Sequence, residues 1–120
     1  MPTYRIEVVT GELSPDALAR SDAKIRVTLY GSSGSTDELV LDPNRSPGNG
    51  VDTFLLRLGE LGDVQRLRVG YDDTGLSPAW FLEGIAVHNE GTGASWSFPC
   101  HRWLARHRDD GEIERVLDAA

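Results

Sequence analysis

Apolar and polar residues alternate along most of this chain, which is the pattern of β-strands with one buried face. Tyr4, Ile6 and Val8, for example, alternate with Arg5 and Glu7. The same two-residue period predicts strands over residues 4–8, 24–30, 39–41, 54–58, 66–71, 80–87, 94–100 and 112–117. The last segment also fits the spacing of a short helix, so its assignment as a strand rests on the weakest pattern.

Turn-forming residues separate these segments, and no long amphipathic helix interrupts them. Glycine, often with proline, serine, asparagine or aspartate, occurs at residues 10–12, 31–35, 42–51, 59–63, 72–78 and 89–93. Short strands divided by such turns indicate an all-β sandwich or barrel. We therefore expect residues 1–120 to form a single all-β domain.

Two local features modify the alternation. The apolar positions change parity between Leu82 and Ile85, since one number is even and the other odd. A β-bulge near Glu83–Gly84 would restore the inward direction of both side chains, and glycine in a strand often marks such a bulge. Pro99 has no backbone N–H, which predicts either an edge position or a local break for the seventh strand.

Composition and charge narrow the range of functions. The chain has 39% apolar and 26% charged residues, as is ordinary for a folded domain. Its formal net charge of −7 argues against nucleic-acid binding, which needs a basic surface. No apolar run approaches the roughly 20 residues of a transmembrane helix, and the N-terminus lacks the pattern of a signal peptide. We expect a protein that is cytoplasmic or peripheral to a membrane.

The sequence argues against a catalytic site and against functions that depend on cysteine. Cys100 is the one cysteine, which excludes an intramolecular disulfide and a cysteine metal cluster. On a regular strand Cys100 and His101 would point to opposite faces and could not pair as nucleophile and base, so we expect a buried, inert thiol. His88, His101 and His107 lack metal-ligand spacing. We expect no enzymatic activity and no organic cofactor.

The segment from Gly70 to Leu82, GYDDTGLSPAWFL, closely resembles the signature of PLAT/LH2 (polycystin-1, lipoxygenase, alpha-toxin) domains, in their polycystin-like form. Six further matches follow the order of that family along nearly the whole chain. They are YRIEVVTGE from Tyr4, Ser21–Ala23, Leu29–Gly31, Val51–Phe54, Leu61–Val64, and Phe98–Cys100 with Trp103–Leu104. Independently of the resemblance, Trp103 and Leu104 follow the seventh strand and are expected to anchor the core.

This resemblance implies a β-sandwich of two four-stranded antiparallel sheets and a non-catalytic role. It implies a module that binds a membrane lipid or lipid surface, often with calcium held in loops at one end. The alternative is a protein-interaction module that binds neither. Two departures argue against calcium binding: Pro47–Gly50 lacks the acidic residue that the family often has there, and Arg20 places a cation beside Asp22.

Calcium prefers about six to eight oxygen ligands from carboxylates and carbonyls. Alternate loops of a sandwich share an end, so residues distant in the sequence could converge there. The candidate ligands in predicted loops are Glu12, Asp22, Asn49, Asp72 and Asp73. The alternative is that these residues only form turns, which their side chains favour by bonding to nearby backbone groups.

Two further surfaces are predicted. Leu13, Leu76 and Trp80 are candidates for apolar lipid contacts near loop tips. Trp80 and Leu82 fall on the same face of the predicted strand. The alternative for Trp80 is therefore a core position in which the indole N–H donates a hydrogen bond to the backbone. A basic patch is expected where cationic side chains lie on the solvent-facing side of two strands, namely Lys24, Arg26, Arg66 and Arg68.

Overall fold

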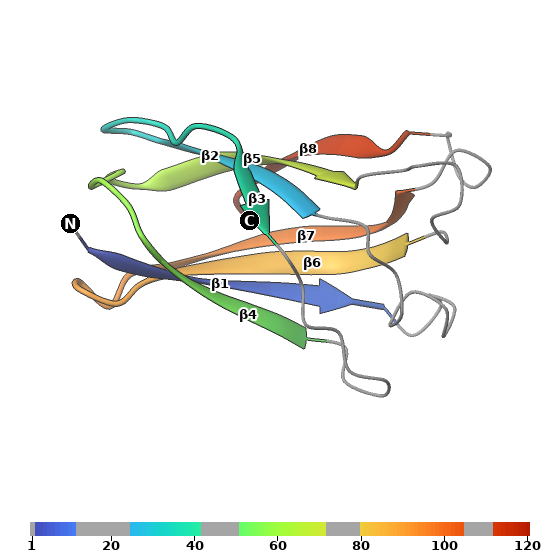
Figure 1. The fold of residues 1–120 in the computed structure, drawn as a ribbon, viewed down its shortest axis with the longest axis horizontal. Helices are drawn as coiled ribbons and strands as arrows, with labels where there is room; N and C mark the ends of the chain where they lie inside the picture. The colour runs from blue at the N-terminus through green and yellow to red at the C-terminus, as the bar shows by residue number, and fades with distance from the viewer. Residues whose placement is uncertain (1, 12–24, 42–50, 72–79, 105–111) are drawn as a thin grey trace.

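The computed structural model describes residues 2–11, 25–41, 51–71, 80–104 and 112–120. These residues form eight β-strands and no helix (Figure 1). The strands are β1 (Thr3–Thr10), β2 (Ile25–Gly31), β3 (Leu39–Leu41), β4 (Val51–Arg57), β5 (Val64–Tyr71), β6 (Trp80–Asn89), β7 (Ser95–Leu104) and β8 (Glu114–Asp118). The all-β class predicted from the alternation is confirmed.

The strands build a sandwich of two four-stranded antiparallel sheets, as the family resemblance implied. One sheet has the order β4-β1-β6-β7 and the other the order β3-β2-β5-β8, one layer above the other (Figure 1). The ambiguous C-terminal segment is a strand, because β8 pairs with β5 and places Leu117 opposite Leu67. Pro99 lies in β7 at a sheet edge, where the missing N–H is tolerated.

Alternate side chains of the two sheets face each other and form the core. Tyr4, Ile6 and Val8 of β1 are fully buried, as are Ile25 and Val27 of β2. The remaining buried apolar side chains are Leu29, Leu41, Leu61, Val64, Leu67, Val69, Trp80, Leu82, Ile85, Val87, Phe98, Leu104 and Leu117. Removing this apolar surface from water supplies the main driving force for folding.

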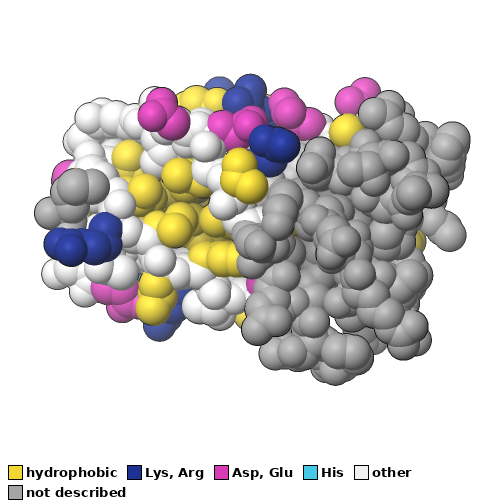
Figure 2. All heavy atoms as spheres, in the orientation of Figure 1, with side chains coloured by type: hydrophobic (Ala, Val, Ile, Leu, Met, Phe, Trp, Pro, Cys, Tyr) yellow, Lys and Arg dark blue, Asp and Glu magenta, His cyan; other side chains and the backbone are white. Residues whose placement is uncertain are grey.

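The two sides of the sandwich are closed to different extents. β7 packs against β8 and β5, which covers the core on that side. On the other side Leu39 of β3, Phe54 and Leu56 of β4, and Leu58 directly after β4 are only partly buried. Figure 2 shows hydrophobic side chains gathered on this face, between the two sheets and beside the part drawn in grey.

The predicted bulge near Glu83–Gly84 is confirmed. β1 pairs Val9 with Gly84 but Thr10 with Leu82, so Glu83 is the extra residue of β6. A second bulge was not predicted. Gly31 lies opposite Val64 while Tyr30 lies opposite Arg66, which leaves Gln65 as the extra residue of β5.

A buried polar cluster closes the end of the sandwich where β4 leads into β5. The Tyr4 hydroxyl accepts a hydrogen bond from the Leu61 backbone N–H at 3.1 Å and lies 3.4 Å from Glu60 Oε1. The Asn89 amide donates to the same hydroxyl at 3.4 Å, and its oxygen accepts from the Gly91 N–H at 2.9 Å. Asn89 is 1% exposed, so its polar groups depend on these partners rather than on water.

Replacing Asn89 by alanine should lower the free energy of unfolding by about 1–3 kcal/mol, because the Gly91 N–H loses its acceptor and the Tyr4 hydroxyl one partner. Urea denaturation followed by far-ultraviolet circular dichroism measures this change. The matched control is Thr92→Ala, which removes only an exposed hydroxyl that accepts from the Ala94 N–H. Equal losses for the two variants would contradict the role given to Asn89.

Candidate binding surfaces

Several strand ends meet at one end of the sandwich. The strand register places Ile25 opposite both Tyr71 and Leu41, and Trp80 opposite Leu104. Figure 1 shows these ends, together with the end of β1 and the start of β4, on the same side. We call this side the loop end. It is the end to which residues 12–24, 42–50, 72–79 and 105–111 connect.

Most of the predicted ligands and lipid contacts lie outside the described residues. This holds for Glu12, Leu13, Asp22, Asn49, Asp72, Asp73 and Leu76, and also for Lys24 of the predicted basic patch. The described strands that flank these segments start or finish at the loop end. In the part of the chain that the structure describes, no group of three or more His, Cys, Asp or Glu side chains could hold a metal ion.

Trp80 is a core side chain, so its assignment as an exposed lipid contact is corrected. Its side chain is fully buried at the start of β6. The indole N–H donates a hydrogen bond to the Thr10 hydroxyl at 2.9 Å. Leu82, two residues further along the same strand, is also fully buried. The alternation of faces therefore indicated correctly that Trp80 packs in the core.

An aromatic pair that was not predicted as a surface lies at the loop end. Phe81 and Trp103 are opposite each other on β6 and β7 and are partly exposed. Their ring centroids are 5.3 Å apart at an interplanar angle of 77°, an edge-to-face contact. A side chain at Gly11 would overlap the Phe81 ring, so the glycine lets this ring lie against the backbone.

The expectation that both Trp103 and Leu104 anchor the core is half right. Leu104 is fully buried, whereas Trp103 faces outward beside Phe81. Adjacent strand residues point to opposite faces, so the two side chains could not both lie in the core. The Arg115 guanidinium holds this end of β7 by donating to the Trp103 carbonyl at 2.7 and 3.1 Å.

The predicted basic patch is electrically balanced among the described residues. Arg26, Arg66 and Arg68 lie on the outer face of the β3-β2-β5-β8 sheet, and each is near a carboxylate. The atom pairs are Arg66 Nε and Asp118 Oδ1 at 2.8 Å, Arg26 Nη1 and Glu38 Oε1 at 3.2 Å, Arg68 Nε and Glu114 Oε1 at 3.7 Å, and Arg68 Nη2 and Glu38 Oε2 at 3.9 Å. Exposed pairs of this kind each contribute about 0–1 kcal/mol.

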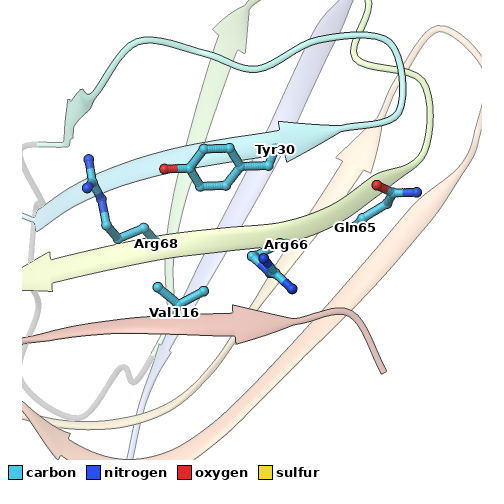
Figure 3. Close-up of a pocket in the computed structure, with 5 residues that line it drawn as sticks. All are labelled: Tyr30, Gln65, Arg66, Arg68 and Val116. Carbon is cyan, nitrogen blue, oxygen red and sulfur yellow. The ribbon is translucent and has the colours of Figure 1, made fainter.

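An open pocket of about 450 Å³ lies within this outer face. Figure 3 shows Tyr30 on β2, Gln65, Arg66 and Arg68 on β5, and Val116 on β8 around it. The bulge at Gln65 turns both Gln65 and Arg66 outward, so these neighbours line the same pocket. The sequence carried one signal for this bulge, since Val64 is even-numbered and the inward residues after it are odd.

Cys100 departs from the expected full burial. It is partly exposed and packs against the core from β7. The next residue, His101, has a positive φ of 56°, and its Nδ1 lies 2.6 Å from Glu83 Oε1. The bulges of β6 and β7 bring His101 and Glu83 together on the exposed surface. Neither residue pairs with Cys100 as a nucleophile pairs with its base.

Comparison with known protein families matches residues 4–118 to the PLAT/LH2 domain. The chain belongs to the PLAT/LH2 domain family. This PLAT domain is 31% identical over 120 residues to mouse lipoxygenase homology domain-containing protein 1, across 96% of the chain and 6% of that protein. It is 36% identical over 118 residues to human polycystin-1-like protein 3, across 95% of the chain and 7% of that protein.

Solved structures agree with this assignment. The PLAT domain superposes on a LOX variant crystallised with arachidonate with a TM-score of 0.79 at 26% identity, over 100% of this chain and 17% of that one. It superposes on coral 8R-lipoxygenase, described as calcium-activated via a C2-like domain, with a TM-score of 0.74 at 26% identity, over 98% and 17%. The chain thus spans a small part of the length of each of these proteins. Separately, the described residues contain no helix that is long and apolar enough to cross a membrane.

Proposed function

We propose that this PLAT domain is a non-catalytic module that docks onto an anionic lipid surface through its loop end, with calcium as the bridge. The observation that carries this proposal is the convergence of strand ends beside the segments that contain the acidic candidates. The likeness to coral 8R-lipoxygenase, where calcium acts via a C2-like domain, supports the same end.

Charge explains why a metal would be needed. A chain of net charge −7 is repelled by an anionic membrane. A bound divalent cation reverses the local charge and can share its coordination between protein carboxylates and lipid phosphates. Glu12, Asp22, Asn49, Asp72 and Asp73 are the proposed protein ligands, with Leu13 and Leu76 as apolar contacts beside them.

The aromatic pair gives the loop end a second means of contact. Tryptophan is favoured at membrane interfaces because one part of its ring system is apolar and the N–H is polar. Trp103 and Phe81 are partly exposed at this end, whereas Trp80 is buried behind them. We therefore assign the interfacial contact to Trp103 and Phe81 in place of Trp80.

Co-sedimentation with phosphatidylserine-containing vesicles tests the proposal. The wild-type chain should sediment with the vesicles in calcium and remain in solution in EGTA or in magnesium. Asp72→Asn with Asp73→Asn should lose most of the calcium-dependent binding, because two charged oxygen ligands become neutral. The matched control, Asp37→Asn with Asp63→Asn, makes the same charge change at exposed positions next to β3 and β5, away from the loop end, and should bind normally.

The same experiment separates the alternative function. Binding that is absent with calcium, or that is unchanged by chelation and by the Asp72 and Asp73 substitutions, would contradict calcium-bridged docking. Absence of vesicle binding in every condition would favour a protein-interaction module that uses a sheet face or edge.

A further inference from the structure

The four edge strands of the described sandwich differ in how they are protected against pairing with another strand. Natural sheet edges are usually short, charged, bulged or interrupted by proline. β3 has three residues, β7 carries Pro99 and a bulge, and β8 has five residues of which three are charged. β4 has seven residues, no proline or lysine, and a register with β1 that is uninterrupted from Val51 to Arg57.

β4 also carries apolar side chains on both faces, with Asp52 at one end of the inner face and Arg57 at one end of the outer face. On the outer face Leu55 is 65% exposed and Val51 is 39% exposed. On the inner face Phe54 and Leu56 pack against the core but are only partly buried. Long, regular and apolar edge strands are the ones that recruit a further strand.

We propose that the occupant of this edge is a second copy of the chain, with β4 pairing antiparallel to β4 of the second copy across a two-fold axis at Leu55. The two sheets would join into one continuous sheet of four plus four strands. Only β4 would be used by both copies, so the interface is closed and does not propagate into a fibre. The proposal is independent of calcium and lipid.

Charge complementarity selects this register. A two-fold axis perpendicular to the sheet keeps the same residues on the outer face in both copies. When this axis passes through Leu55, Thr53 lies opposite Arg57 of the second copy. Thr53 lies opposite Glu7 on β1. Two strand spacings, about 10 Å, therefore separate Glu7 from Arg57 of the second copy, with only a small threonine between them. Glu7 already contacts Arg5 Nε at 3.2 Å and His88 Nε2 at 2.9 Å. An arginine side chain of the second copy can extend over this threonine toward the same carboxylate.

Neighbouring registers lack this feature. An axis at Leu56 would place Arg57 opposite Leu55 of the second copy, whose partner on β1 is Arg5, and the like charges would repel. An axis at Phe54 would place Arg57 opposite Val51, whose partner on β1 is Val9, and no charge would be met. The Leu55 register alone of these three brings opposite charges together, once on each side of the axis.

Sedimentation equilibrium of the whole chain over a range of concentrations tests the dimer. The wild-type chain should show a monomer–dimer equilibrium. Leu55→Lys, which places two cations face to face at the axis, should raise the dimer dissociation constant by at least about tenfold. Val116→Lys is the matched control, because Val116 is 58% exposed on β8 and should leave the equilibrium unchanged. A monomer at every concentration, a larger aggregate, or equal effects of the two variants would overturn the proposal.

Oxidative cross-linking tests the register without weakening the interface. Leu55→Cys places two thiols directly opposite each other and should form a disulfide-linked dimer. Arg57→Cys places them four residues apart along the paired strands, roughly 13 Å, and should not. The wild-type chain, which carries Cys100, sets the background. Linkage through position 57 in preference to 55 would overturn the proposed axis, and so would the absence of linkage through both.

Discussion

Replacing Trp80 by alanine should lower the free energy of unfolding by about 3–5 kcal/mol, the range expected for removing a large buried aromatic side chain. Trp80 is among the largest fully buried side chains, and it lies where β6 leaves the loop end. Its removal loses the apolar contacts of the indole, leaves a cavity and deprives the Thr10 hydroxyl of the hydrogen bond it accepts. Chemical denaturation monitored by circular dichroism measures the loss.

Two variants divide this effect into its parts. Thr10→Val removes the hydroxyl that accepts from the buried indole N–H while keeping the indole packed, and should cost about 1–3 kcal/mol. Trp103→Ala removes a tryptophan from the partly exposed outer face and should cost clearly less than Trp80→Ala. If Trp103→Ala destabilised the chain as much as Trp80→Ala, the division into one core tryptophan and one surface tryptophan would be wrong.

Replacing Gly31 by alanine should lower the free energy of unfolding by about 2–3 kcal/mol, as overpacking does. A methyl group at Gly31 would overlap the backbone carbonyl oxygen of Leu61. That oxygen also accepts a hydrogen bond from the Ser33 N–H at 2.9 Å, and the Leu61 side chain is buried in the core. The carbonyl therefore cannot move aside without loss of the hydrogen bond or disturbance of the core.

Gly34 provides the matched control for Gly31, because it lies three residues later in the same turn. A methyl group at Gly34 would meet no atom within 4 Å, so Gly34→Ala should change stability by less than about 0.5 kcal/mol. Thermal melts of the two variants should differ visibly. Similar melting temperatures for both would show that the close approach of β2 to Leu61 is not rigid.

The fold could be predicted from the sequence because a buried face leaves a strict two-residue period. Tyr4, Ile6 and Val8 show this period and are all buried. The change of parity between Leu82 and Ile85 was enough to locate the bulge at Glu83. The arrangement into two four-stranded sheets came from the family resemblance, since alternation gives the faces of strands but not their neighbours.

Features that depend on strand register were missed. The pairing of Arg68 with Glu38 and Glu114 requires knowing which strands are adjacent and how they are aligned, so the sequence indicated cations without their partners. The outward position of Trp103 was missed because its neighbour Leu104 has the same apolar character. A period of two identifies a face only when polar residues mark the opposite one.

Fluorescence quenching by brominated phosphatidylserine vesicles in calcium tests most directly whether the loop end meets the lipid. Wild-type fluorescence should be quenched, and Trp96→Phe should be quenched as well, because Trp96 packs against the core from the inner face of β7. Quenching should be lost in Trp103→Phe, which retains the buried Trp80. Quenching that survives Trp103→Phe, or its absence when the chain sediments with the vesicles, would contradict docking through the loop end and the Phe81–Trp103 pair.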